Sequence, residues 1–342
     1  MRGSAGLGAI SILFALALAG CGNGQVIGSG PLPTAPPVTP NVSFEYKVTT
    51  ANSSPAAIVT GKDGFLYFTE QAASKIGQLT TNGSLKEIST KTAAAHPADI
   101  IVGPDNLIWF TEPGVHKIAQ ITSFTATAPT NEHTVPWANA APAFMAVGTA
   151  SNTMYFTDTA NSAIGEVTTL GTFTGPFATL TPNANPLGIA LGPDNNMWFC
   201  ENGVDKIGHF NASTNTVDHE FTLSPGAHPV QIVQGPDGAM WFTENNAAGP
   251  KLGRISTQGV MNEYTLTGAK SATGLALDIF GNFVITDPTN NSIGVFTVNT
   301  LSFTEYPIKT ANSNPTSVTL GPDARMYFTE TAANQIGQFS YF

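Results

Sequence analysis

Residues 235–244 read Gly235-Pro-Asp-Gly-Ala-Met-Trp-Phe-Thr-Glu244, and the end of this stretch recurs along the chain. Aromatic and β-branched residues at these positions favour a β-strand. The acid that ends each copy, here called the signature acid, recurs every 42–46 residues, which indicates a repeat architecture. The seven copies are Tyr67-Phe-Thr-Glu70, Trp109-Phe-Thr-Glu112, Tyr155-Phe-Thr-Asp158, Trp198-Phe-Cys-Glu201, Trp241-Phe-Thr-Glu244, Val284-Ile-Thr-Asp287 and Tyr327-Phe-Thr-Glu330.

Other strand signals surround each signature. A turn such as Gly235-Pro-Asp-Gly238 precedes it, and before that turn lies a short apolar strand that usually opens with Pro, as in Pro186-Leu-Gly-Ile-Ala-Leu191. A third strand is marked by Ile-Gly, as at Ile207-Gly208, and a fourth follows, as in Met261-Asn-Glu-Tyr-Thr-Leu266. Four antiparallel strands in each of seven repeats predict an all-β fold, a seven-bladed β-propeller over residues 42–342.

The two ends of the repeat region predict how the ring closes. Residues 43–55 resemble residues 302–315, which form a fourth strand leading into a new repeat. The last repeat has only three strands before the chain ends at Phe342. We therefore predict that residues 43–49 pair with residues 335–340 as the fourth strand of the last blade, which would cover two exposed sheet edges.

The composition excludes some classes of function. Charged residues make up 11% of the 342 residues, the formal net charge is -10, and the 13 basic residues are scattered. A nucleic-acid-binding surface needs a basic patch, so we expect no nucleic-acid partner. The 34 Gly and 24 Pro residues disfavour an all-helical fold and favour one rich in turns.

The N-terminal segment predicts export. Residues 1–21 combine Arg2, an apolar run too short to span a bilayer comfortably, and Leu18-Ala19-Gly20-Cys21, which resembles a bacterial lipobox. This motif implies cleavage before Cys21 and lipidation of its thiol; an ordinary signal peptide is the alternative. Residues 22–41 are rich in Gly and Pro and predict a disordered linker. We expect an exported cell-envelope lipoprotein, in the outer membrane or periplasm if the cell is Gram-negative, that touches the membrane only through its lipid.

The Trp-Phe-Thr-Glu, Gly-Pro-Asp-Gly and Lys-Ile-Gly elements together resemble the virginiamycin B lyase (streptogramin lyase) family, and the resemblance covers all seven repeats. It implies elimination at the ester bond of a cyclic depsipeptide antibiotic, with Mg²⁺, a His base and a Glu metal ligand. It also implies that the functional His residues directly follow the Pro of the innermost strand in two late blades. One of these Pro residues would be preceded by Glu, and another Glu would follow the signature acid in the last blade.

The positions that would carry this chemistry hold other residues in this chain. No His follows the Pro, or its equivalent, in any repeat, and no carboxylate follows a signature acid. An elimination needs a base and a cation that stabilises the developing enolate. The residues after the Pro positions are Ala56, Ala98, Ala143, Leu187, Val230, Gly274 and Thr316, and those after the acids are Gln71, Pro113, Thr159, Asn202, Asn245, Pro288 and Thr331.

A ligand site is predicted at one mouth of the central channel. Antiparallel pairing places the start of the first strand beside the end of the second, so residues near each Pro and each signature acid share one face. His96 and His228 precede their Pro residues and are the candidate catalytic or ligand-binding imidazoles; exposed turn residues are the alternative. The other candidates for a ligand-binding face are Asn185, Asn314, Glu112 and Glu244; no metal ligand is assigned.

Several chemically suggestive residues have a structural interpretation. A signature Glu is followed across a loop by Lys75, Lys117, Lys206 or Lys251 in four repeats, which predicts a hairpin hydrogen bond or ion pair within the blade rather than a cation site. We expect Trp109, Trp198 and Trp241 to fill interfaces between blades, and Cys200 to be a buried small residue. His116, His133, His209 and His219 are expected at the surface.

Two functions remain open at this stage. The first is a binding module that holds a small molecule or peptide on the channel face, because the fold alone does not determine function. The second is a Mg-dependent carbon-oxygen lyase of the virginiamycin B lyase type, or a hydrolase of a cyclic peptide or ester, with relocated residues such as His96 and His228. No cofactor is certain, and we expect a monomer.

Overall fold

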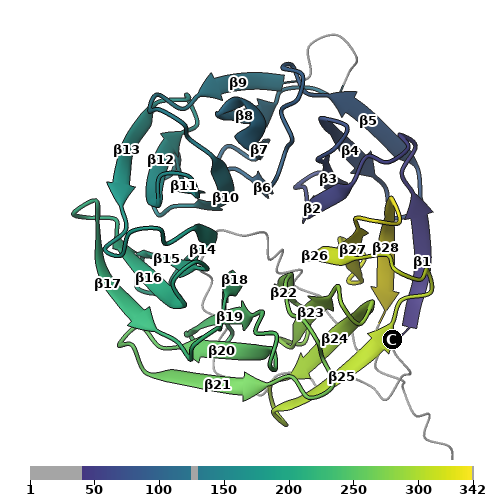
Figure 1. The fold of residues 1–342 in the computed structure, drawn as a ribbon. Coiled ribbons are helices and arrows are strands. Elements are labelled where there is room, and N and C mark those ends of the chain that lie inside the picture. The colour runs from purple at the N-terminus through teal and green to yellow at the C-terminus, as the bar shows by residue number, and fades with distance from the viewer. Residues whose placement is uncertain (1–40, 125–129, 341–342) are drawn as a thin grey trace, which may run out of the picture.

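The computed structural model describes residues 41–124 and 130–340. The described residues form seven four-stranded antiparallel sheets arranged around a centre, as Figure 1 shows. This arrangement confirms the predicted seven-bladed propeller. A 3₁₀ turn, η1 (Pro113–Val115), lies in the loop that follows the signature acid Glu112. Within the described ranges, we find no helix with the length and apolar character needed to cross a membrane. The predicted leader, Cys21 and nearly all of the predicted linker fall before residue 41, outside the described residues.

Each blade has an inner strand next to the centre and a second strand that carries the signature. The inner strands are β2 (Pro55–Thr60), β6 (Ile100–Val102), β10 (Pro142–Val147), β14 (Pro186–Leu191), β18 (Pro229–Gln234), β22 (Leu275–Leu277) and β26 (Pro315–Leu320). The second strands are β3 (Leu66–Glu70), β7 (Ile108–Glu112), β11 (Thr153–Asp158), β15 (Met197–Glu201), β19 (Met240–Glu244), β23 (Phe283–Asp287) and β27 (Met326–Glu330).

A third strand and an outer strand complete each sheet. The third strands are β4 (Lys75–Leu79), β8 (Lys117–Ile121), β12 (Ala163–Thr168), β16 (Lys206–Asn211), β20 (Lys251–Ile255), β24 (Ser292–Thr297) and β28 (Gln335–Ser340). The outer strands are β5 (Leu85–Ser89), β9 (Thr130–Thr134), β13 (Phe173–Ala178), β17 (Thr216–Thr222), β21 (Met261–Thr265), β25 (Ser302–Pro307) and β1 (Asn41–Lys47). We number the blades 1 to 7 from β2 onward, so blade 7 contains β26 to β28 and β1.

The ring closes as the sequence predicts. β1 pairs with β28 in an antiparallel register that runs from Asn41 opposite Ser340 to Lys47 opposite Gln335. Val42 is 1% exposed and joins a core cluster that contains residues of blades 6 and 7. The first strand of the described chain therefore completes the last sheet.

The second strands are the most buried strands of each blade. All residues of β7, β15 and β19 are buried, including the large rings of Trp109, Trp198 and Trp241. Trp109 clusters with Met145 and Met154 of blade 3, which confirms that it fills an interface between blades. Trp198 and Trp241 cluster with residues of blades 5 and 6 in the same way.

The Ile-Gly pattern of the third strand follows from this packing. A Cβ atom added at Gly253 would lie 2.1 Å from the ring of Phe242 on the neighbouring strand. The same conflict arises at Gly208, where the ring of Phe199 would lie 2.2 Å away. Since real Cβ atoms do not approach so closely, the ring of the signature Phe occupies the space that a side chain at Gly208 or Gly253 would need. In blade 2, the small Ala119 takes the place of Gly opposite Phe110.

The signature Thr connects neighbouring blades through hydrogen bonds. Thr243 accepts a hydrogen bond from the backbone N–H of Gln231 in its own blade at 3.2 Å, and its Oγ1 donates to the carbonyl of Thr273 in the next blade at 2.9 Å. Equivalent Thr residues bridge other blades, as Thr111 does to the carbonyl of Ala143. Cys200 replaces this Thr in blade 4 and is fully buried, as predicted.

Removal of β1 tests ring closure. Deleting residues 41–47 would expose the edge of β28 and leave the contacts of Val42 unfilled. We expect the deletion to abolish cooperative thermal unfolding in calorimetry. Phe44→Ser, a change at a 58%-exposed side chain in the same strand, is the control and should melt like the parent. A deletion variant that melts like the full chain would show that closure by β1 is dispensable.

Thr243→Val tests the hydrogen bonds between blades. The change keeps the side-chain shape but leaves the Gln231 N–H and the Thr273 carbonyl without this partner. We expect the free energy of unfolding in urea to fall by about 1–3 kcal/mol. Thr174→Val, at an exposed position of β13, is the matched control and should change stability by less than about 0.5 kcal/mol. Equal effects of the two variants would contradict the bridging role.

Candidate functional site

Strand pairing builds one face of the ring from corresponding positions in each blade. Pro186 lies opposite Glu201 in blade 4, and Pro229 lies opposite Glu244 in blade 5. The residue before each inner strand therefore lies near the residue after each signature acid. We call these two sets of positions the channel face, because the inner strands surround the centre of the ring in Figure 1.

Five residues that precede the inner strands adopt a left-handed backbone conformation. Asn tolerates positive φ well and His is enriched there relative to most residues, whereas other side chains pay a larger steric cost. The chain thus turns sharply before the inner strand and places a polar residue at each of these turns. The five residues are Ser54 (φ 55°), His96 (φ 49°), Asn185 (φ 46°), His228 (φ 44°) and Asn314 (φ 55°).

The two candidate imidazoles are exposed and rest on the preceding blade. His228 Nδ1 lies 3.1 Å from the carbonyl oxygen of Asn202 and 3.7 Å from Oδ1 of Asp205. The backbone N–H of His228 also donates to Asp205 at 2.9 Å. His96 Nδ1 lies 3.2 Å from the carbonyl oxygen of Gln71. Figure 1 places β6 and β18, which follow the two imidazoles, on opposite sides of the centre, so the structure does not bring the two together.

Asn185 and Asn314 are both half-buried. Asn185 Nδ2 donates to Oδ1 of Asn202 at 3.4 Å, and Asn202 Nδ2 donates to the carbonyl of Pro229 at 3.1 Å. Asn202 therefore links Asn185 of blade 4 to the turn of blade 5 that carries His228. From the sequence, Asn202 is recognisable only as a residue that stands in place of a carboxylate, and nothing in the pattern indicates this linking position.

The structure places Glu112 and Glu244 beneath the face rather than on it. Both are fully buried, so a ligand on the channel face does not reach either carboxyl group. Burial, and then the negative charge of Glu132, raise the pKa of Glu112 to about 8. Burial and the charge of Glu263 likewise raise the pKa of Glu244 to about 7. In the described residues, no hydrogen-bond partner lies within reach of either carboxyl group.

The lysines form ion pairs within their blades, but the prediction that their partners are the signature acids is wrong. Lys206 lies opposite Glu201 in the strand register, but its ammonium group bonds Glu220 of the outer strand at 2.7 Å. Lys117 likewise bonds Glu132 at 2.6 Å rather than Glu112. A Cα register fixes which residues are neighbours but not where a long flexible side chain ends. The same partner change holds in the two other blades with Lys, as Lys75–Glu87 at 3.1 Å and Lys251–Glu263 at 2.5 Å.

The outer-strand glutamates hold the loops between blades. Glu220 accepts the backbone N–H of Thr181 at 2.7 Å and its hydroxyl at 2.5 Å, and Thr181 lies in the loop that leads from blade 3 into blade 4. Burial opposes ionisation of Glu220, but the bonds from Lys206 and Thr181 outweigh it and lower its pKa. Sequence reasoning missed this role. The available signal was a Glu near the middle of most fourth strands, as in Met261-Asn-Glu-Tyr.

Asp99 is a second group that the sequence reading missed. Its carboxylate accepts the backbone N–H of Met145 at 2.8 Å, which joins the inner segments of blades 2 and 3. Burial raises the pKa of Asp99 to about 7. The signal was present, since Asp99 is the one acid in the stretches that run from each Pro position through the inner strand.

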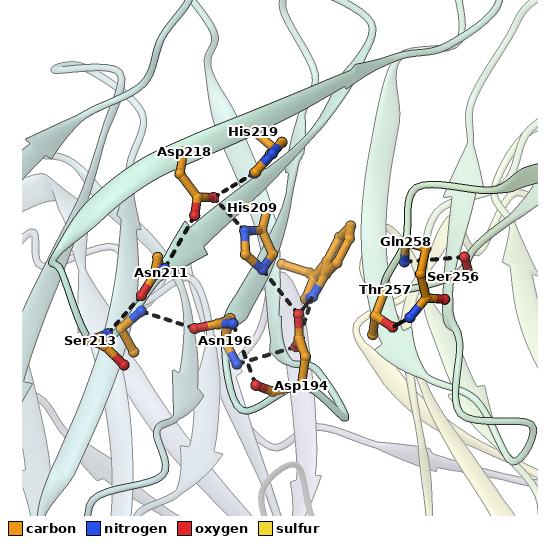
Figure 2. Close-up of polar contacts among 12 residues, drawn as sticks. Asp194, Asn196, His209, Asn211, Ser213, Asp218, His219, Ser256, Thr257 and Gln258 are labelled. Atoms are coloured by element: carbon orange, nitrogen blue, oxygen red, sulfur yellow. Dashed lines mark hydrogen bonds and ion pairs between the residues drawn. The ribbon is translucent and has the colours of Figure 1, made fainter.

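The prediction for His209 is wrong, and those for two other histidines hold. His116 and His219 are exposed as predicted, and His133 is half-buried. His209 lies in β16 and is buried, because its ring packs against Trp198 with centroids 4.7 Å apart. It lies between Asp194 and Asp218, as Figure 2 shows, at 3.0 Å and 2.5 Å.

Comparison with known proteins decides the family. The family model described as "Virginiamycin B lyase family" matches residues 38–213 and 130–341. The chain belongs to this family. The search of curated proteins gives no match.

Three solved lyase structures share this fold. A streptogramin B lyase structure has 29% sequence identity and a TM-score of 0.78, and the alignment covers 87% of this chain and 96% of the other. Virginiamycin B lyase from Staphylococcus aureus has 27% identity and a TM-score of 0.79, with coverage of 87% and 98%. A catalytically inactive variant of the S. aureus enzyme with quinupristin has 26% identity and a TM-score of 0.78, with coverage of 87% and 98%.

The channel face of this family member does not fit a Mg²⁺ site at the positions that the resemblance implied. Mg²⁺ prefers oxygen ligands, usually including one or two carboxylates. The positions after the signature acids hold no carboxylate, and those after the Pro residues hold no His. Glu112, Glu201 and Glu244 are buried with pKa values raised to about 7 or 8, and do not present ionised oxygens to this face. We therefore assign no step of a reaction to Mg²⁺.

Glu201→Gln tests the buried neutral acids. Burial, and then the charge of Glu220, raise the pKa of Glu201 from 4.5 to about 8. Folding therefore favours the protonated form, and the stability that this gives is present below pH 4.5 and lost as the pH rises to about 8. Gln mimics the protonated acid. In urea denaturation, we expect the variant to match the parent near pH 5 and to exceed its free energy of unfolding by roughly 1–3 kcal/mol near pH 9.

Glu220→Gln is the matched control with the opposite sign. The pKa of Glu220 is lowered in the folded protein, so its contribution is present above the unfolded pKa and lost on acidification. This variant should be less stable than the parent near pH 9, and the difference should shrink below about pH 4. A pH-independent effect of Glu201→Gln would show that Glu201 is ionised in the folded protein.

Proposed function

We propose that the protein is a binding module that holds a small molecule or cyclic peptide on its channel face. The observation that carries the proposal is that five residues with a left-handed backbone, which are Ser, Asn or His, lie at corresponding turns of five blades. These groups donate and accept hydrogen bonds without fixed charge, apart from what the histidines contribute. The backbone fixes their turns, so little conformational freedom is lost when they bind.

The chemistry of this face favours recognition over elimination. His228 and Asn202 lie together between blades 4 and 5, and Asn185 adds a second amide. Such groups match the amides and esters of a cyclic peptide. No carboxylate stands at the positions where the family resemblance implied a metal ligand. Binding without turnover is therefore the function that this set of residues supports best.

A second candidate is lyase or hydrolase activity with relocated residues. It is favoured by Asp99, whose pKa of about 7 suits a general base at neutral pH, and which lies three residues after the exposed His96. In this case His228 would contact the substrate from the opposite side of the ring. Under this hypothesis, the chain has the lyase activity for which its solved relatives are named, but different side chains perform it.

Export and lipid attachment are part of the proposal and depend only on residues 1–21. Lipidation at Cys21 would hold the propeller at a membrane surface, where its channel face meets ligands outside the cytoplasm. A monomer is sufficient for this role, since each of the face residues comes from one chain.

Quinupristin with Mg²⁺ is the probe that tests the proposal. We expect calorimetry to show binding and mass spectrometry to show no linear product. His228→Ala should weaken binding by about tenfold, the loss of one hydrogen-bonding group. His133→Asn, in outer strand β9, is the matched control and should bind like the parent.

The outcomes separate the two candidates. Linear product that disappears in His228→Ala or Asp99→Asn would establish the lyase reading and overturn the binding module. Binding that is unchanged in His228→Ala would remove the channel face as the site. An absence of both binding and product would show that cyclic depsipeptides are not the ligand class.

A further inference from the structure

Blade 4 holds a cluster of imidazole and carboxylate groups away from the channel face. His209 lies in third strand β16, and Asp218 and His219 lie in outer strand β17. Figure 2 shows both imidazoles directed at one Asp218 oxygen, with His209 Nδ1 at 2.5 Å and His219 Nδ1 at 3.0 Å. One ligand atom from each of the three residues lies within 4.8 Å of the others.

A β-bulge gathers these side chains. His209 lies opposite His219 in the register, but the next pair is Phe210 opposite Val217, so Asp218 is the extra residue of the outer strand. In a regular strand, neighbouring side chains point to opposite faces. The bulge re-aims one of them, and both Asp218 and His219 contact His209 or each other on the same side. The backbone thus builds the cluster.

Asp194 fixes the orientation of the buried imidazole. Its Oδ2 lies 3.0 Å from His209 Nε2, and Trp198 Nε1 donates to the same carboxylate at 3.2 Å. Metal-binding histidines almost always donate their second ring N–H to such a carboxylate or to a carbonyl, which leaves the other nitrogen free to bind the ion. Here that other nitrogen is Nδ1, which faces Asp218 and His219.

The cluster is open to solvent on one side. The side chain of His219 is 65% exposed and that of Asp218 is 28% exposed, whereas His209 is 11% exposed. An ion can therefore enter without opening the blade. Two imidazole nitrogens and one carboxylate suit zinc and related transition metals, whereas Mg²⁺ and Ca²⁺ prefer oxygen ligands throughout.

We propose that blade 4 binds a divalent ion of the zinc class through His209 Nδ1, His219 Nδ1 and the Asp218 carboxylate. Asp194 is a positioning residue that acts through His209, and water completes the coordination. This site lies between the third and outer strands, whereas the channel face lies beside the inner strands. It is therefore independent of the proposed function.

The corresponding positions in other blades show that the fold does not require these histidines. Gln78 and Gln338 stand where blade 4 has His209, and each donates to a Tyr hydroxyl, at 2.8 Å and 2.5 Å. Asn131 and Asn262 stand where it has His219. Replacement of either histidine by the residue of its sister blades is thus compatible with the propeller.

The competing explanation is an imidazolium held between two aspartates without any metal. Burial lowers the pKa of His209, but its bonds to Asp194 and Asp218 outweigh this and raise it overall. Such a clamp stabilises the blade but binds no ion. A zinc titration separates the two explanations.

The test is calorimetric titration of the untagged full chain with zinc chloride alone. We expect one zinc ion per chain. His209→Gln and His219→Asn should each weaken binding by at least about 100-fold, because each removes a direct ligand. Asp194→Asn should weaken it by about 10–100-fold, the range for a group behind a ligand. His133→Asn, which removes a histidine that also stacks on a buried Trp, is the control and should bind zinc normally.

Cobalt absorption and melting curves complete the test. Asp194→Asn should shift the visible spectrum of the cobalt-loaded chain, a change that a purely structural role would not produce. His219→Asn should melt like the parent without metal, since His219 is exposed, and should lose the stabilisation that zinc gives the parent. The proposal is overturned if the parent binds no more zinc than the two histidine variants, or if His219→Asn binds zinc as the parent does.

Discussion

Seven blades form a closed ring only if the last blade is held to the first, and the pairing of β1 with β28 does this because β1 is part of blade 7 and continues directly into β2 of blade 1. The interactions at this junction repeat those elsewhere in the ring. Glu87 of β5 in blade 1 accepts the backbone N–H of Thr50, in the loop from β1 to β2, at 2.8 Å, as Glu220 does from Thr181 in blade 4. Thr329 donates to the carbonyl of Ala56 across the closure, as Thr243 does between blades 5 and 6. The junction therefore has the same hydrogen bonds as the continuous interfaces.

The polar groups of the propeller divide into two sets with different tasks. The signature Glu and Thr residues, the lysines and the outer-strand Glu residues lie inside the blades or tie them together. The turns before the inner strands hold the other set, the Ser, Asn and His side chains of the channel face. This division explains why a chain with few charges has buried acids in most blades. It also explains why Glu112 and Glu244, two candidates for the ligand-binding face, lie buried inside their blades.

The sequence predicted the fold well because a propeller is encoded in short local patterns. Strand signals, Gly-Pro-Asp turns and the spacing of the acids sufficed for strand order, blade number and closure. The sequence did not predict contacts that depend on how far a long side chain extends or on a local irregularity of a strand. Lys206 lies opposite Glu201, but its ammonium group extends to Glu220. His209 is predicted at the surface, whereas it is buried in the structure. The β-bulge at Asp218, which places side chains of the outer strand against His209, leaves no signal in the sequence pattern.

The buried acids also change how the net charge should be counted. The formal value of -10 counts every Asp and Glu as ionised. Six acids of the described residues have pKa values raised to about 7 or 8 by burial, namely Glu70, Asp99, Glu112, Glu201, Glu244 and Glu330. In mildly acidic surroundings, the folded chain therefore migrates in an electric field as a less acidic particle than its composition implies. Self-repulsion within the ring grows only as these interior groups release their protons.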